Sequence, residues 1–215
     1  PLLMIRIPSV RNKQEKSSFK REFAEGFAFI KNARGFMPLI MLGTVLNFLV
    51  TPLSTLLPYF VRFDHLGGVG DFAFVMAFVQ GGMLAGGLLM SVISGFERKM
   101  VTMTLAMYVF FLGYMLIALT PIGLFWFMAA SGLVMLFCIP IVNVSYQTIV
   151  QTRVPMEMQG RVNSVDMAMS SAAQPFGIVL SGVIVEFIGT ANLFLACAGL
   201  GILILTLSWF LTDIK

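Results

Sequence analysis

Six long apolar runs, separated by short polar connections, set the pattern of this chain. They lie at about residues 36–61, 71–94, 100–120, 122–150, 161–188 and 190–211. A helix of about 20 residues crosses the roughly 30 Å hydrocarbon core of a membrane. The runs lack the alternation of barrel strands, and an open sheet would leave its edges unpaired in lipid. The pattern therefore predicts an all-α membrane protein, with a bundle of six antiparallel transmembrane helices over residues 36–212.

The fifth apolar run carries polar residues at steps of three or four, which places them on one face of a helix. These residues are Asn163, Asp166, Ser170, Gln174, Gly177 and Ser181. A lipid-facing helix has no use for such a face. We expect it to look at another helix or at a water-filled cavity.

Four side-chain amides fall near the middle of four different predicted helices. Counting about 1.5 Å per residue from the charged helix ends places Asn47, Gln80, Asn143 and Gln174 at a similar depth. Amides in membranes often join helices, at about 0.6–2 kcal/mol for each hydrogen bond. A polar layer at the midplane is also where transporters place their substrate sites. The residues alone leave both interpretations open, and the distribution over particular helices favours the second.

Asp166 and Glu186 are the carboxylates of the fifth helix. They are twenty residues apart, which is about 30 Å along a helix, so each lies near an opposite face of the membrane. Asp166 lies about one turn inside the membrane on the polar face. It is either a coupling group of a transport cycle or a partner of Arg161 or Arg98 in an interfacial ion pair.

Residues 8–35 are the soluble stretch and hold seven of the fourteen Lys and Arg. Within them Phe19, Phe23, Phe27 and Ile30 fall on one face of a predicted amphipathic helix. A basic helix of this kind lies either on an anionic membrane surface or against the cytoplasmic face of its own protein.

The basic residues predict the orientation. If residues 8–35 are cytoplasmic, thirteen of the fourteen Lys and Arg lie on that side and only Arg62 lies opposite. This asymmetry predicts a multi-pass protein of the cytoplasmic (inner) membrane with both termini in the cytoplasm. It also accounts for the net charge of +4 without a nucleic-acid partner. Residues 1–7 resemble the end of a preceding transmembrane helix, so we expect the chain to be a fragment or half of a longer protein.

The composition excludes most catalytic classes. Hydrophobic residues make up 58% of the chain and charged residues only 11%, which is too few to cover a water-facing surface. Cys138 and Cys197 lie inside apolar runs, and His65 is the single histidine. No serine has a histidine nearby, and zinc-protease, CxxC and phosphate-loop motifs are absent. We therefore expect no enzyme activity, no cofactor and no metal site.

The second helix contains the glycine-rich string Gly81-Gly82-Met83-Leu84-Ala85-Gly86-Gly87. Small residues four apart let helix backbones approach closely.

The connection before the fifth helix contains a motif that resembles one of a known family. Its residues Val154-Pro155-Met156-Glu157-Met158-Gln159-Gly160-Arg161-Val162-Asn163-Ser164 resemble the VPxExxGRVxS loop between spans ten and eleven of major facilitator superfamily exporters. The similar branch contains the macrolide-efflux and enterobactin-exporter proteins. The lead-in Phe19–Phe27, the string Gly43-Thr44-Val45-Leu46-Asn47-Phe48 and the loop Leu66-Gly67-Gly68 are also similar to that branch.

The resemblance implies that the chain is the C-terminal half of a twelve-helix transporter, spans seven to twelve. Its first and fourth helices would line the cavity, and its second and fifth would contact the missing N-terminal half. The implied substrate-binding residues are Asn47, Thr51, Asn143, Tyr146 and Gln147. The implied contact with the other half comprises Gln80, Gly82, Gly86, Ser170 and Gln174. The implied coupling or gating residues are Asp166, Arg161, Glu157 and Arg98.

These observations together predict a secondary active exporter that works by proton antiport and alternating access. Because the midplane carries amides and no fixed charge, we expect a bulky, largely apolar small molecule of the drug, macrolide or siderophore type. The expected partners are this substrate, protons, the lipid bilayer and the N-terminal half. The alternative is a non-transporting membrane scaffold or sensor of the same fold, acting as a homodimer if six spans are the whole protein.

Overall fold

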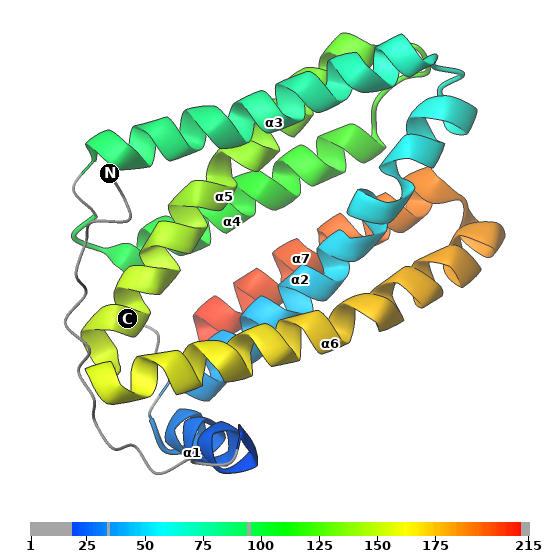
Figure 1. Ribbon diagram of the computed structural model, residues 1–215. Coiled ribbons are helices and arrows are strands. Elements are labelled where there is room, and N and C mark those ends of the chain that lie inside the picture. The colour runs from blue at the N-terminus through cyan, green and yellow to red at the C-terminus, as the bar shows by residue number, and fades with distance from the viewer. Residues whose placement is uncertain (1–18, 34, 94–95, 212–215) are drawn as a thin grey trace, which may run out of the picture.

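The computed structural model describes residues 19–33, 35–93 and 96–211 and shows a bundle of long helices (Figure 1). Residues 1–7 and the predicted preceding helix end lie outside these ranges. Six helices of the described chain are long and apolar enough to cross a membrane. The elements are α1 (Phe19–Asn32), α2 (Phe36–Tyr59), the short π-helix η2 (Phe60–Asp64), α3 (Val69–Val92), α4 (Lys99–Ala118), α5 (Phe125–Arg153), α6 (Met156–Ile188) and α7 (Thr190–Leu211).

The all-α prediction and the six spans are confirmed, with one difference at the start of α6. The fourth and fifth apolar runs leave a polar connection over residues 151–160, but only Val154 and Pro155 separate α5 from α6. Proline lacks the backbone N–H that a helix interior needs but is tolerated at a helix start. The first turn of α6 contains Glu157, and the positive end of the helix dipole stabilises its carboxylate. The polar residues of this segment therefore belong to the first turns of α6.

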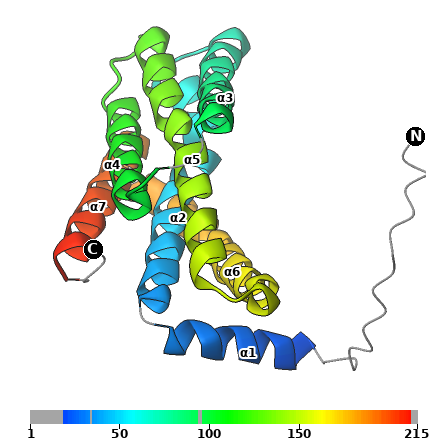
Figure 2. The same cartoon turned by 90° about the vertical axis from the view of Figure 1, so that its left-hand side faces the viewer.

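The six long helices pack in two groups of three that share the same arrangement. Helix α2 packs on α6 and α7, and α5 packs in the same way on α3 and α4, while α4 and α7 pack together between them. Figures 1 and 2 show the two groups as α3–α5–α4 and α6–α2–α7. Along the chain the six long helices form two triplets, α2–α3–α4 and α5–α6–α7. The first helix of each triplet packs on the second and third helices of the other triplet. This exchange is the arrangement expected of two inverted three-helix repeats.

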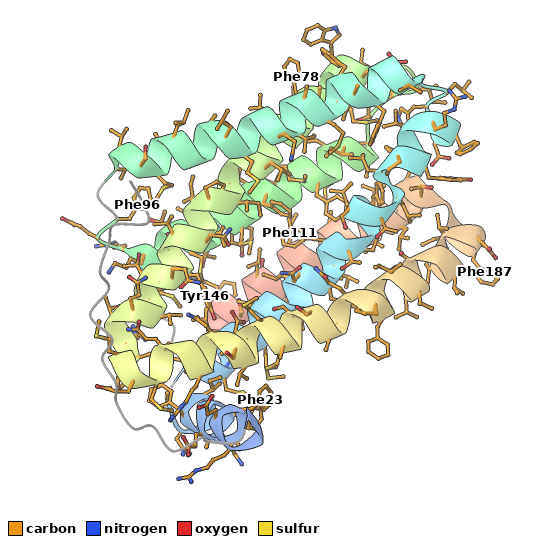
Figure 3. All side chains as sticks on the ribbon, viewed as in Figure 1. Phe23, Phe78, Phe96, Phe111, Tyr146 and Phe187 are labelled. Atoms are coloured by element: carbon orange, nitrogen blue, oxygen red, sulfur yellow. The ribbon has the colours of Figure 1, made fainter. Side chains whose placement is uncertain are left out.

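Aromatic side chains fill the contact between the groups near the end of the bundle that carries η2. Phe60, Phe111, Tyr114 and Phe194 are each at most 1% exposed. Phe60 and Tyr114 pack on Phe194 with ring centroids 5.1 and 5.6 Å apart, respectively. Figure 3 shows Phe111 inside the bundle, whereas Phe187 points away from it.

His65 joins η2 to the connection between α4 and α5. The side chain is buried, with its Nε2 atom 3.0 Å from the Thr120 carbonyl oxygen and its Nδ1 atom 3.2 Å from the Phe60 carbonyl oxygen. The single histidine is thus a structural cross-link between two helix ends.

Two glycines of α3, Gly82 and Gly86, face α5. A Cβ atom at Gly82 would overlap the Leu133 carbonyl oxygen, and one at Gly86 would overlap that of Phe137. The close approach that these glycines permit is therefore a contact within this chain. Gly81 and Gly87, by contrast, have open space beside them. The expected contact of Gly82 and Gly86 with a missing half stays a prediction.

Helix α1 packs on the start of α6, as in one of the two positions expected for the amphipathic helix. A Cβ atom at Gly26 would lie 2.8 Å from the Arg161 carbonyl oxygen, and Ile30 is 0% exposed. Glu25 accepts a hydrogen bond from Arg161 and one from Arg21. Phe27, expected on the packed face, is exposed instead. Helix α1 is thereby held against the end of the bundle where α2 and α6 begin.

Candidate functional site

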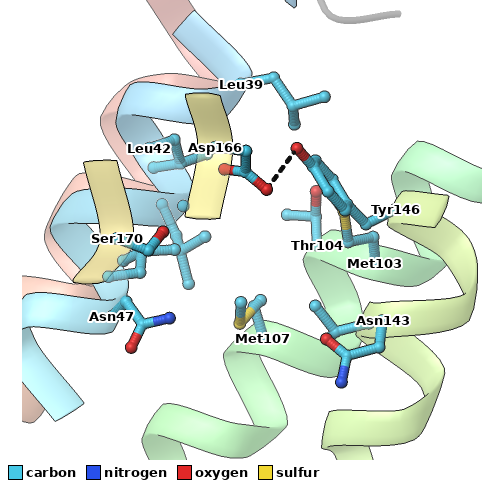
Figure 4. Close-up of a pocket in the computed structure, with 14 residues that line it drawn as sticks. Leu39, Leu42, Asn47, Met103, Thr104, Met107, Asn143, Tyr146, Asp166 and Ser170 are labelled. Carbon is cyan, nitrogen blue, oxygen red and sulfur yellow. Dashed lines mark hydrogen bonds between the residues drawn. The ribbon is translucent and has the colours of Figure 1, made fainter. Parts of the chain in front are cut away.

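A cavity of about 170 Å³ lies where the two helix groups face each other (Figure 4). Helices α2, α4, α5, α6 and α7 all contribute to its wall. Its lining residues are Leu39, Leu42, Gly43, Leu46, Asn47, Met103, Thr104, Met107, Val142, Asn143, Tyr146, Asp166, Ser170 and Leu205. The wall is therefore largely apolar with a few polar groups, which is the usual composition of a site for an organic ligand.

Two amides face each other across this cavity. Asn47 comes from α2 and Asn143 from α5, which are the first helices of the two triplets (Figure 4). Both residues are exposed, and their side chains form no hydrogen bond with any other residue of the described chain. The same holds for Gln80 and Gln174, so none of the four midplane amides joins two helices within residues 19–33, 35–93 and 96–211. Their free donors and acceptors are available to another molecule.

The carboxylate of Asp166 reaches the cavity from α6. It accepts a hydrogen bond of 2.9 Å from the hydroxyl of Tyr146 on α5 (Figure 4). This bond links α5 and α6, which otherwise contact each other little. Neither Arg161 nor Arg98 forms an ion pair with Asp166 in the described structure, because Arg161 turns to Glu25 on α1. The expected interfacial ion pair is thus replaced by a tyrosine–aspartate pair at the cavity.

The hydroxyl of Thr51 is directed into the protein and away from the cavity. Thr51 is buried, donates a hydrogen bond of 3.2 Å to the Asn47 carbonyl oxygen and packs against Gly177 of α6. Its role is to hold α2 close to α6. Gln147 is exposed and lies outside the cavity wall.

The remaining candidate residues lie at two places. Ser170 lines the cavity, whereas Gln80 and Gln174 are exposed on α3 and α6. Glu157 and Arg98 are exposed at the end of the bundle where α6 and α4 begin. The structure therefore brings together Asn47, Asn143, Tyr146, Asp166 and Ser170 and leaves the others apart.

Sequence reasoning missed the contribution of α4. Met103, Thr104 and Met107 line the cavity, although the third apolar run contains no midplane amide. Their spacing of one, three and four positions does put them on one side of a helix. Nothing in the run itself shows that this side points inward.

Within the described residues no three His, Cys, Asp or Glu side chains gather where they could hold a metal ion. The described wall of the cavity contains one carboxylate, Asp166, and no histidine or cysteine.

Comparison with known proteins identifies the family. The model of the Major Facilitator Superfamily matches residues 2–170. The chain belongs to the major facilitator superfamily. The six-helix bundle, with its two triplets, corresponds to one half of the fold of this superfamily. The cavity lies between α2 and α5, the first helices of the two triplets.

Two groups of relatives carry efflux names. The chain is 24% identical to macrolide efflux protein A of Streptococcus pyogenes over 215 residues, 99% of this chain and 53% of the relative. It is 32% identical to the multidrug efflux pump Tap of Mycobacterium tuberculosis over 177 residues, 81% of this chain and 41% of the relative. The chain thus spans about half the length of these relatives. No solved structure matches it significantly. Family and relatives indicate a multi-pass membrane protein of a transporter family.

Proposed function

We propose that this chain is the C-terminal half of a secondary active transporter that exports a bulky, amphiphilic small molecule of the drug, macrolide or siderophore type. Transport proceeds by alternating access and is driven by proton antiport. The partner for this activity is an N-terminal six-helix half, since the efflux relatives are about twice as long as the region that this chain matches.

The observation that carries the proposal is the pair of unbonded amides in an apolar wall. Asn47 and Asn143 offer donors and acceptors without a fixed charge, and methionines and leucines surround them. Flexible thioether side chains adapt to ligands of different shape. Such a wall suits a molecule with a large apolar surface and a few hydrogen-bonding groups.

The size of the cavity supports the proposal that this chain supplies only part of the substrate site. Its volume is about 170 Å³, whereas sites for drug-sized ligands have volumes of about 300–1,000 Å³. A second half packed on the exposed faces of α3 and α6 would supply the rest of the wall. Gln80 and Gln174 on those faces would then contact that half.

Proton coupling is assigned to Asp166 because it is the one carboxylate in the cavity wall. Its hydrogen bond with Tyr146 joins α6 to α5, so gain or loss of a proton at Asp166 would act on two helices at once. Arg161 holds the start of α6 against α1 through Glu25 and is assigned a gating role together with the exposed Glu157 and Arg98. Both termini are placed in the cytoplasm, because thirteen of the fourteen Lys and Arg lie on that side.

The test of the substrate site is export by the protein that the native gene encodes, in a bacterial strain without its own efflux pumps. The variants Asn47→Leu and Asn143→Leu should raise the accumulation of a radiolabelled macrolide to the level of cells without the transporter. Asn192→Leu is the matched control, since that amide bonds the Ile188 carbonyl oxygen outside the cavity. Unchanged export by the first two variants, at equal protein levels, would refute the cavity assignment.

A second measurement separates a transporter from a scaffold. A cysteine at position 47, in a background with Cys138 and Cys197 replaced by alanine, should react with a water-soluble thiol reagent. Addition of the substrate should protect it. A position that never reacts would favour the scaffold.

Proton coupling is tested with Asp166→Asn in everted membrane vesicles. The wild-type protein should release protons from acidified vesicles when substrate is added, and the variant should not. Substrate-driven proton release that persists in the variant would place the coupling carboxylate elsewhere.

A further inference from the structure

A second cavity, of about 640 Å³, lies at the end of the bundle that carries α1. The start of α4, the end of α5 and the end of α7 enclose it. It shares no lining residue with the amide-containing cavity. Of its lining residues, Arg98 alone has a role in the transport cycle proposed above, as one of the gating residues.

The wall of this second cavity carries three basic side chains from two helices. Arg98 and Lys99 come from the start of α4 and Arg153 from the end of α5. Within the described chain none of the three forms an ion pair, and Glu97, the one carboxylate on the wall, has no ionic partner either. The described part of the wall, with three cations and one carboxylate, therefore has a net positive charge.

The position of two of these residues makes the charge unfavourable for the protein alone. Arg98 and Lys99 lie at the start of α4, where the helix dipole is itself positive, and the first turn contains no acidic residue. Cations are destabilising at this end of a helix, and an anion there is stabilising. The positive-inside rule explains basic residues on this side of the membrane. It does not explain why they converge on one cavity from two helices.

The depth of the cavity points to a lipid. All three helix ends that enclose it belong to helices long and apolar enough to cross a membrane, and Trp209, on its wall, comes two residues before the end of α7. Tryptophan is enriched at the level of the lipid headgroups. Val101 lines the cavity, and the exposed Leu105 lies one turn further along the same side of α4. An acyl chain would find apolar surface there directly beside the basic wall.

We propose that this cavity binds the phosphate group of an anionic phospholipid. Arg98, Lys99 and Arg153 contact the phosphate, Trp209 lies beside the headgroup, and the acyl chains follow the outer side of α4. A bound lipid of this kind neutralises the start of α4 and connects the ends of α4, α5 and α7.

The test uses the full protein encoded by the native gene, purified in a mild detergent and titrated with phosphatidylglycerol in native mass spectrometry. Phosphatidylcholine and inorganic phosphate are the comparison ligands. The double variant Arg98→Gln/Arg153→Gln removes two cations from the cavity. Its matched control, Arg21→Gln/Lys31→Gln, removes two exposed cations from α1 on the same side of the membrane.

Two basic side chains near an anionic lipid correspond to a factor of about thirty in affinity. We therefore expect the cavity variant to bind phosphatidylglycerol about thirtyfold more weakly and the control to bind it like wild type. The conservative variant Arg98→Lys/Arg153→Lys should retain most of the binding, which keeps the test decisive if the glutamine variant does not fold.

Three results would overturn the proposal. Equal weakening in the cavity variant and the control would show attraction to the basic surface as a whole. Equal retention of phosphatidylcholine would show that the headgroup charge is not recognised. Displacement of the lipid by millimolar inorganic phosphate would show a site for free phosphate.

Discussion

Replacing Gly82 with alanine should weaken the contact between α3 and α5, the most extensive helix–helix contact of the described bundle. The added Cβ atom would overlap the Leu133 carbonyl oxygen and lie 2.9 Å from the carbonyl carbon and Cα atom of the same residue. All three atoms belong to the backbone of α5, so no side chain can turn away. The two helices must separate to accept one methyl group.

Overpacking of this kind costs about 1–3 kcal/mol. The matched control is Gly81→Ala on the same turn, where an added Cβ atom meets nothing within 4 Å. There alanine should be neutral or stabilise the helix by up to about 1 kcal/mol, since it has the higher helix propensity. Thermal unfolding in detergent, followed by loss of the monodisperse peak in size-exclusion chromatography, should give a midpoint several degrees lower for Gly82→Ala than for Gly81→Ala.

Equal midpoints for the two alanine variants would contradict the assignment of Gly82 to the α3–α5 contact. Normal stability of Gly82→Ala combined with loss of transport would return Gly82 to the contact with the N-terminal half. The two outcomes are separable because stability and transport are measured on the same protein.

Three further substitutions test other contacts. Gly26→Val should detach α1 from α6, because its side chain would collide with the Arg161 carbonyl; protease cleavage within α1 should then become faster, and unchanged cleavage would refute the packing. Tyr146→Phe should lower stability by about 1.5–3 kcal/mol if the hydrogen bond to Asp166 is made to a charged carboxylate, and a loss near zero would show that the bond contributes nothing. His65→Phe should cost about 1–3 kcal/mol in thermal unfolding, because the carbonyl that His65 contacts in the α4–α5 connection loses its partner; an unaltered midpoint would argue against the cross-link.

The fold could be predicted from the sequence because each apolar run is long enough to be a helix by itself. The length of a run sets the membrane crossing, and the basic residues at the ends set the expected orientation. The same reasoning located Asn47 and Asn143 at one depth, and the structure places both on the wall of one cavity.

The direction in which each helix faces could not be predicted in the same way. Gly81, Gly82, Gly86 and Gly87 offer small residues on two sides of α3, and only the structure shows that the second and third face α5. The partner of Asp166 is another case. The basic residue five positions before it was a plausible partner, but the approach of α5 supplied a tyrosine, and Arg161 paired with a helix far away in the sequence. Helix rotation and crossing depend on all partners at once, which a single run of residues does not contain.

The exchanged packing of the two triplets also sets the order in which the bundle can assemble during synthesis. Helices α3, α4 and α5 are consecutive and can associate as soon as α5 has entered the membrane. Helix α2 precedes them, yet its packing partners α6 and α7 are the last to be made. At about 5–20 residues per second, α2 remains in the bilayer for roughly 8–30 s before both of these helices have been made. A ribosome that stalls before α6 would therefore leave α2 without either of these packing partners, open to membrane quality-control proteases.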